Sequence, residues 1–279
     1  MSEEYLGSIN VSLEFKFPPI DIVRDGLLYA FDWTSFNGDG TLTDRSSNGY
    51  NATYSGSLTV SGSNLQFDGV TSYIQMSDNA KSGAYNSWQW TIDTYGSLYP
   101  QTITTGSDYG RIIAGNLGPT AGTPSASWGY PTTNIQPYWQ FGLYKSGSNS
   151  PELTMWNALT NARNTVTSSL NSSQFTYLGV SSSAGSTIST YYNTDNLPTT
   201  KSNNTIIRSF DAGRTNQFNL TSSIQTFGGP RIDYSSPFGR IDVLPLSASI
   251  KYITYYDRTL TDIELAQNNE FYLTGNPIP

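Results

Sequence analysis

Apolar and polar side chains alternate along much of this chain with a period of two, which is the period of β-strands buried on one face. Clusters of Gly, Asn, Asp and Ser separate the alternating segments, as turn residues do. The clearest segments are residues 27–33, 65–74, 90–95, 139–144, 175–180, 187–193, 206–210 and 250–255. We therefore predict an all-β protein of many short strands joined by tight turns.

One helix is predicted, near the C-terminus. Thr261 and Glu264 have the spacing of a capping box, in which the Thr hydroxyl and the Glu carboxylate each bond to the other residue's backbone N–H. Gly275 is suited to end the helix. We expect the helix to lie over the sandwich, with Ile263 and Leu265 contributing apolar contacts.

The composition supports this class and excludes several chemistries. With 279 residues, 14% aromatic and only 13% charged, the chain can bury a large core without a helical framework. Cys and His are both absent, which excludes thiol catalysis, His-based triads and the usual transition-metal sites. Any metal would be a hard cation on oxygen ligands.

The net charge and the N-terminal residues limit the kinds of partner that we expect the protein to bind. A net charge of −7 without a basic run argues against nucleic acid and against an anionic membrane surface. No apolar stretch reaches transmembrane length, and the acidic start lacks the pattern of a signal peptide. We expect a protein made in the cytoplasm without an export signal and without membrane insertion.

Residues 25–74 and 250–265 resemble the opening and closing of a concanavalin A-like jelly-roll module, of the laminin-G or pentraxin kind. The most specific part is the ending with Arg258, Leu260, Thr261 and Glu264. The resemblance spans roughly residues 25–272 and implies a two-sheet antiparallel jelly-roll sandwich with one short C-terminal helix. Tyr95 stands at the usual Trp position of the family.

The chain is predicted to divide at residue 25, with an arm over 1–24 and the jelly-roll domain over 25–279. Residues 9–17 alternate like a strand, and Pro18-Pro19 would hold that strand away from the module. Its apolar positions are Val11, Leu13, Phe15 and Phe17. We interpret it as a docking arm that pairs with another chain; the alternative is an extra edge strand of the same domain.

The sequence lacks the catalytic signature of the glucanases in this superfamily. Those enzymes carry a Glu-x-Asp-x-x-Glu strand, since retaining hydrolysis needs two carboxylates about 5 Å apart. No Glu of this chain lies in such a pattern. We therefore predict that the protein is not an enzyme.

The sequence offers two kinds of candidate binding site, a metal site and a surface of aromatic side chains. Asp44, Ser46 and Asn48 present oxygens at alternate positions and are a weak candidate for Ca²⁺, although an ordinary self-bonded turn is favoured and no cofactor is predicted. Asp233 and Asp242 are a weaker second candidate for a metal.

The predicted irregular segment 115–138 and its border carry exposed-type aromatics. These are Trp128, Tyr130, Tyr138 and Trp139. Such side chains stack on sugar rings, but they also lead protein interfaces, so both interpretations stay open. A second irregular segment is predicted over 221–240.

The resemblance implies a virion surface protein, since stand-alone modules of this kind recur in phage proteins. We expect a capsid decoration, head-fibre or tail-fibre component that docks to other virion proteins through its arm, forms a homo-oligomer and displays a lectin-like module to host surfaces or glycans. The alternatives are a carbohydrate-binding adhesin and, less favoured, a glycosidase of the same superfamily.

Overall fold

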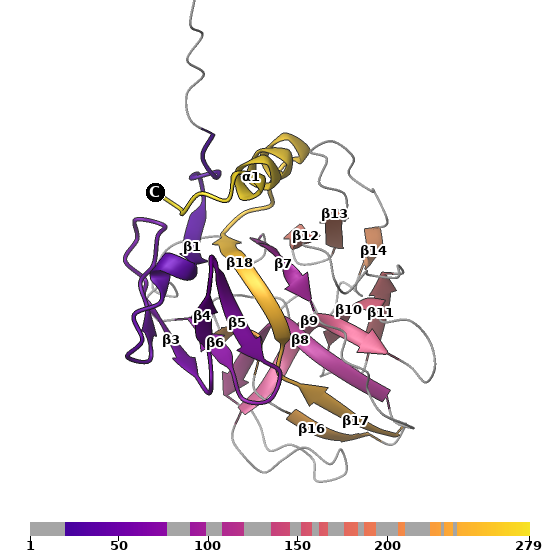
Figure 1. Cartoon of the computed structure of the whole chain (residues 1–279). Coiled ribbons are helices and arrows are strands. Elements are labelled where there is room, and N and C mark those ends of the chain that lie inside the picture. Colours follow the sequence, from indigo (N-terminus) through magenta and orange to yellow (C-terminus); the bar gives the residue numbers. More distant parts are fainter. Residues whose placement is uncertain are drawn as a thin grey trace, which may run out of the picture.

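The fold is a two-sheet β-sandwich with a helix on the outer face of one sheet (Figure 1). The computed structural model describes residues 20–76, 90–98, 108–119, 135–145, 152–157, 162–166, 176–183, 187–193, 206–209, 224–229, 232–236 and 239–279. Within this part both sheets are antiparallel except for one parallel pair. The predicted all-β, jelly-roll-like class with one short C-terminal helix is confirmed.

Sheet A, which carries the helix, is centred on the last strand. In spatial order its strands are β14 (Ile206–Ser209), β13 (Thr187–Asn193), β12 (Thr176–Ser183), β7 (Trp90–Leu98), β18 (Ser247–Tyr256), β5 (Asn64–Asp68) and β4 (Thr59–Ser61). Strand β5 pairs with the first half of β18, and β1 (Leu27–Asp32) pairs with the second half. The front and the end of the chain thus meet in one sheet.

Sheet B forms the other layer. Its order is β11 (Ala162–Val166), β10 (Glu152–Asn157), β9 (Ile135–Lys145), β8 (Asp108–Pro119), β15 (Ile224–Phe227), β6 (Tyr73–Gln75), β3 (Ala52–Ser55) and β2 (Thr41–Leu42). Beside β8 lies β17 (Gly239–Leu244), which runs parallel to it and antiparallel to β16 (Ile232–Ser236).

Two segments predicted to be irregular contain strands instead. The ladder between β8 and β9 continues to the pairing of Pro119 with Ile135, so only 120–134 of the predicted loop lies outside the described residues. Likewise, 221–240 contains β15, β16 and the start of β17. Composition misled here, because backbone pairing with a neighbouring strand outweighs the weak strand preference of Gly, Pro and Ser.

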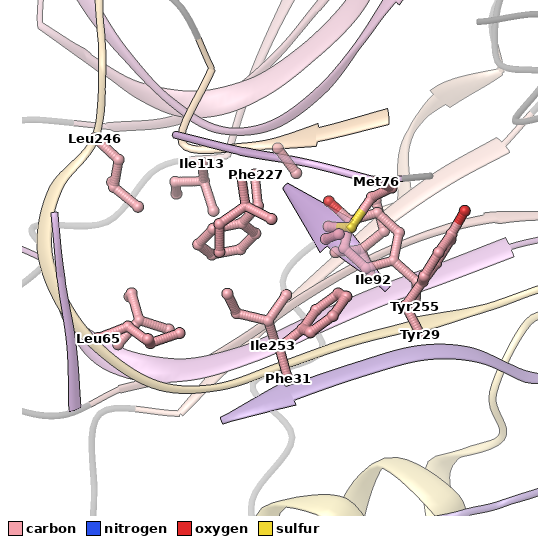
Figure 2. Close-up of a cluster of buried hydrophobic side chains, with 14 of the residues drawn as sticks. Tyr29, Phe31, Leu65, Met76, Ile92, Ile113, Phe227, Leu246, Ile253 and Tyr255 are labelled. Carbon is pink, nitrogen blue, oxygen red and sulfur yellow. The ribbon is translucent and has the colours of Figure 1, made fainter. Parts of the chain in front are cut away.

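The interior between the sheets is apolar. Figure 2 shows Ile113 and Phe227 of sheet B facing Leu65, Phe31 and Ile253 of sheet A. All five side chains are buried. Because each strand turns alternate residues toward this space, the alternation that predicted the strands also predicted which face is inside.

Strand β7 keeps a strict alternation. Trp90 and Ile92 point into the sandwich, whereas Asp93 and Tyr95 lie on the outer face of sheet A. Strand β18 changes phase at Lys251, where its pairing with β7 shifts by one residue. This bulge lies where the partner of β18 changes from β5 to β1.

Helix α1 (Asp262–Thr274) begins and ends as predicted. Thr261 and Glu264 form the capping box, and Gly275 ends the helix in the left-handed conformation, with φ of 73°. The expected contact of Ile263 is wrong, because its side chain is 81% exposed. The face against sheet A consists of Leu265, Asn268, Asn269, Phe271 and Tyr272, so polar residues define it as much as apolar ones.

Packing of the sandwich starts before the predicted boundary at residue 25. Ile22 and Val23 are buried in the cluster under the helix. The backbone N–H of Val23 donates to Oδ1 of Asn268 over 2.8 Å. Residues 21–24, which were assigned to the arm, are therefore held to the domain. No helix in the described residues is long and apolar enough to cross a bilayer.

Candidate functional site

At the edge of the outer face of sheet A, an ion pair connects the two ends of the chain. Arg258 donates to both carboxylate oxygens of Glu264, at 2.6 and 3.0 Å, and its Nε lies 2.9 Å from a carboxylate oxygen of Asp25. The hydrogen bond from Arg258 lowers the pKa of Glu264 to about 2. The ending on which the family resemblance rests is thus a structural joint, and Glu264 is committed to it.

The loop before β3 is tied down by the three residues that were the first metal candidate. Asp44 accepts from the N–H groups of Ala30, Ser46 and Tyr50 at 2.9–3.0 Å and from the Ser46 hydroxyl at 2.5 Å. Asn48 donates to the carbonyls of residues 27 and 28. Both carboxylate oxygens of Asp44 face donors, which is the geometry of a self-bonded turn. Among the described residues no group of three acidic, His or Cys side chains has the arrangement of a metal site.

A second feature of this face is a buried carboxyl group, Asp93. It accepts from the hydroxyls of Thr254, Tyr272 and Tyr177 and from the side-chain amide of Asn268, the last at 2.8 Å. These donors come from β18, α1 and β12. Burial raises the pKa of Asp93, and the four hydrogen bonds oppose that rise. All five side chains are buried.

An exposed patch adjoins this centre where α1 ends, around the ring of Tyr252. The indole of Trp33 packs edge-on against that ring at 5.8 Å, and Nζ of Lys251 lies over the indole at 5.6 Å. The Tyr252 hydroxyl donates to the carbonyl oxygen of Asn276 over 2.6 Å. A Cβ on Gly275 would lie 2.9 Å from Nζ of Lys251, so the ammonium group is at the helix C-terminus. We call Trp33, Lys251 and Asn276 the Trp33 patch.

The Trp33 patch has the chemistry of a small polar ligand site. Trp33 and Lys251 are half-buried and Asn276 is exposed. Burial lowers the pKa of Lys251, and within the described part of the chain its ammonium group has no carboxylate partner. The ammonium group of Lys251 also interacts favourably with the negative end of the helix dipole, which lies at the C-terminus of α1. An indole and a cation therefore lie together beside the exposed end of α1.

Most of the binding residues predicted from sequence lie beyond what the structure describes. Trp128 and Tyr130 are outside the described residues, while Tyr138 and Trp139 belong to strand β9. The arm positions are also outside the described residues; these are Val11, Leu13, Phe15 and Phe17. The backbones of Asp233 and Asp242 pair directly across β16 and β17.

Sequence reasoning missed the Trp33 patch and the Asp93 centre. For Asp93 the sequence held a signal. Within the alternating run of β7, Asp93 shares a face with Thr91 and Tyr95. A carboxyl group could therefore be expected on the sheet face that the predicted helix covers. The sequence held no such signal for the Trp33 patch, because Trp33 and Lys251 are far apart in the chain and Lys251 lies at the bulge of β18.

Comparison with solved structures places this fold beside those of a sialidase and a toxin domain. Trypanosoma rangeli sialidase matches with a TM-score of 0.53 and 12% identity over 88% of this chain and 32% of that chain. The receptor binding domain of botulinum neurotoxin C/D mosaic serotype matches with a TM-score of 0.54 and 10% identity over 91% and 55%. Another structure of the sialidase, in complex with sialic acid, matches at 0.53 and 14% identity, over 88% and 32%.

This chain therefore spans about a third of the sialidase chains and just over half of the toxin chain. A scan of protein-family models and a search of curated proteins give no match. At these identities the matches establish a shared β-sandwich fold.

The prediction that the chain is not an enzyme is contradicted by these matches, because the sialidases with this fold are enzymes. The error has a chemical cause. The missing Glu-x-Asp-x-x-Glu strand excludes one arrangement of catalytic carboxylates, whereas sialidases hydrolyse glycosides with a Tyr nucleophile. A carboxylate motif is therefore no test for every hydrolase.

Proposed function

We propose that this chain is a carbohydrate-binding β-sandwich module and that the Trp33 patch is a contact for the sugar. The observation that carries the proposal is an ammonium group lying over a half-buried indole, next to the exposed residue Asn276 that follows the end of α1. Sugar sites combine an aromatic side chain, which covers the apolar face of the ring, with polar groups that bind the hydroxyls. Lys251 favours a sugar that carries a carboxylate.

The neighbours in fold support the same class of ligand. One sialidase structure holds sialic acid, an acidic sugar, and the toxin domain is described as receptor binding. The aromatics predicted as a binding set, Trp128, Tyr130, Tyr138 and Trp139, are proposed as a second contact surface for glycan or for a partner subunit.

The setting proposed for the module is the surface of a virion. There it would act as a capsid decoration, head-fibre or tail-fibre component and would assemble as a homo-oligomer. This part of the proposal is supported by the family resemblance, and residues 1–19 are the segment proposed to dock to other virion proteins. Locating the protein within purified particles by immunogold labelling tests it, and a protein found only free of particles would overturn it.

Glycan binding is tested by titrating the purified chain with sialyllactose and with lactose, which lacks the carboxylate. We expect binding to sialyllactose to be the tighter, and Lys251→Met to weaken it by at least about tenfold, since a hydrogen bond to a charged group contributes about 1.5–3 kcal/mol. Lys251→Arg is the control that keeps the charge. Failure of both sugars, and of a broader glycan array, would overturn carbohydrate binding.

The same titration samples serve as a hydrolysis assay. Free sialic acid is measured after incubation of sialyllactose with the protein, because the matched sialidases are enzymes.

In the binding titration, equal affinity of wild type and Lys251→Met for sialyllactose would place the sugar elsewhere on the sandwich and remove the Trp33 patch from the proposal.

A further inference from the structure

Among the described residues, the groups that hydrogen-bond to Asp93 are all neutral. Its partners are the hydroxyls of Thr254, Tyr177 and Tyr272 and the amide of Asn268. The titratable side chains that face this centre are Tyr177 on β12, Tyr256 on β18 and Tyr272 on α1. The cation Arg24, in the N-terminal segment, acts electrostatically on Tyr256 and lowers its pKa slightly. Burial raises the pKa of Tyr256 and of Tyr272 well above the usual value, so both stay neutral.

The centre is linked directly to the segment before β1. The amide nitrogen of Asn268 donates to Asp93 at 2.8 Å and to the Tyr256 hydroxyl at 2.9 Å, while its oxygen accepts from the N–H of Val23 at 2.8 Å. The Tyr256 hydroxyl in turn donates to the carbonyl oxygen of Val23 over 3.1 Å. One amide therefore connects the carboxyl group, the helix and the N-terminal segment.

Both ionisation states of Asp93 can be hydrogen-bonded in this site. An ionised carboxylate accepts from all four donors. A protonated carboxyl group can donate to Thr254 or Tyr272, because hydroxyl groups can also accept and their hydrogens rotate. The hydroxyls of Thr254 and Tyr272 lie 2.8 Å apart, so they can reorient together. The remaining difference between the states is the cost of burying a negative charge without a cation.

We propose that Asp93 acts as a proton-linked clamp: proton uptake strengthens the attachment of α1 and of residues 22–24 to sheet A. The geometry supports this because opening of that layer would expose Asp93 to water and break the bonds through Asn268. The clamp therefore governs how firmly the N-terminal segment is held where it joins the domain.

The direction of the effect follows from linkage. In the closed state the pKa of Asp93 is raised, whereas in the opened state it returns toward 3.8. Between the two values the closed state binds more protons, so closure is favoured as pH falls through the raised pKa and weakened as pH rises. One linked proton changes the opening equilibrium by at most about tenfold per pH unit.

Hydrogen exchange on the full chain tests the clamp. Protection factors, corrected for the intrinsic pH dependence of exchange, are measured between pH 4 and 8 for Val23 and for the amides of Leu265–Tyr272. We expect them to rise as pH falls, by up to about tenfold per pH unit within the window. Amides of Thr226 and Phe227 in sheet B, where local opening leaves Asp93 covered, are the internal control.

The variant Asp93→Asn keeps the shape and removes the titration, and we expect it to abolish the pH dependence of these amides. Should it fail to fold, the NMR shift of the Asp93 carboxyl carbon in the wild type gives the answer, with a midpoint above 3.8 expected. The clamp is overturned by protection that is constant or falls as pH falls, by a pH dependence that survives Asp93→Asn, or by a midpoint at or below 3.8.

Discussion

Both faces of sheet A are buried along β1, β7 and β18, but they are built from different chemistry. The inner face meets sheet B through apolar side chains such as Phe31, Leu65 and Ile253. The outer face meets α1 through tyrosines, Asn268 and the carboxyl group of Asp93. On the inner face any side chain of similar size and polarity fits, whereas each group on the outer face needs its particular partner. Burial alone therefore does not tell how a surface is stabilised.

The inner face should show the larger loss on truncation. Phe31→Ala is expected to lower the free energy of unfolding by about 4 kcal/mol, because Phe31 is fully buried and leaves a cavity between the sheets. Val60→Ala on the exposed edge strand β4 is the control, with a change below about 0.5 kcal/mol. Urea denaturation measures both. Equal effects of the two variants would contradict the packing described.

The outer face is tested by changing polarity at nearly constant size. Asn268→Leu should cost about 2–3 kcal/mol, since it removes one donor from Asp93 and leaves the N–H of Val23 without its acceptor. Ala266→Leu, at an exposed position of the same helix, is the control and should be nearly neutral. A stable Asn268→Leu protein would mean that this layer packs like an ordinary apolar core.

The ion pair at the edge of this face gives the smallest expected effect. Glu264→Gln should cost about 1–2 kcal/mol at neutral pH, because it loses the charged hydrogen bonds from Arg258. The pKa of Glu264 is lowered from 4.5 to about 2, so the contribution is complete above pH 4.5 and is lost as pH falls toward 2.

The wild type and Glu264→Gln should therefore converge in stability below about pH 2, as followed by thermal denaturation across a pH series. Glu270→Gln, exposed on the same helix, should leave the curve unchanged. A constant gap between wild type and Glu264→Gln over the whole series would show that the loss does not come from the charge.

The sequence predicted those parts of the fold that local rules determine. Alternation marks β7 and β18, and the pair Thr261 and Glu264 marks the start of α1, because these signals lie within a few residues of one another. The strands of 115–119 and 224–227 escaped prediction, since their pairing depends on neighbours distant in the chain. The exposed Ile263 shows the same limit: hydrophobicity suggested a buried face that the polar contacts of Asn268 overrule.

The candidate site was less predictable than the fold. Asp93 and Asn268 are 175 positions apart in the chain, so nothing local links them. The aromatic set around Trp128 was chosen by residue type, and Trp128 lies outside the described residues. What composition indicates is the presence of binding chemistry; which side chains meet is decided by topology.

The bulge at Lys251 makes the length of the last strand matter more than its composition. Because this extra residue switches which side chains face inward, deleting it would turn Ala248 and Ile250 outward while Ile253 stayed inside. Substitutions at Lys251 keep the phase of the strand, whereas a one-residue insertion or deletion exchanges its two faces. In a lineage of such proteins, this strand would tolerate changes of residue but not of residue count.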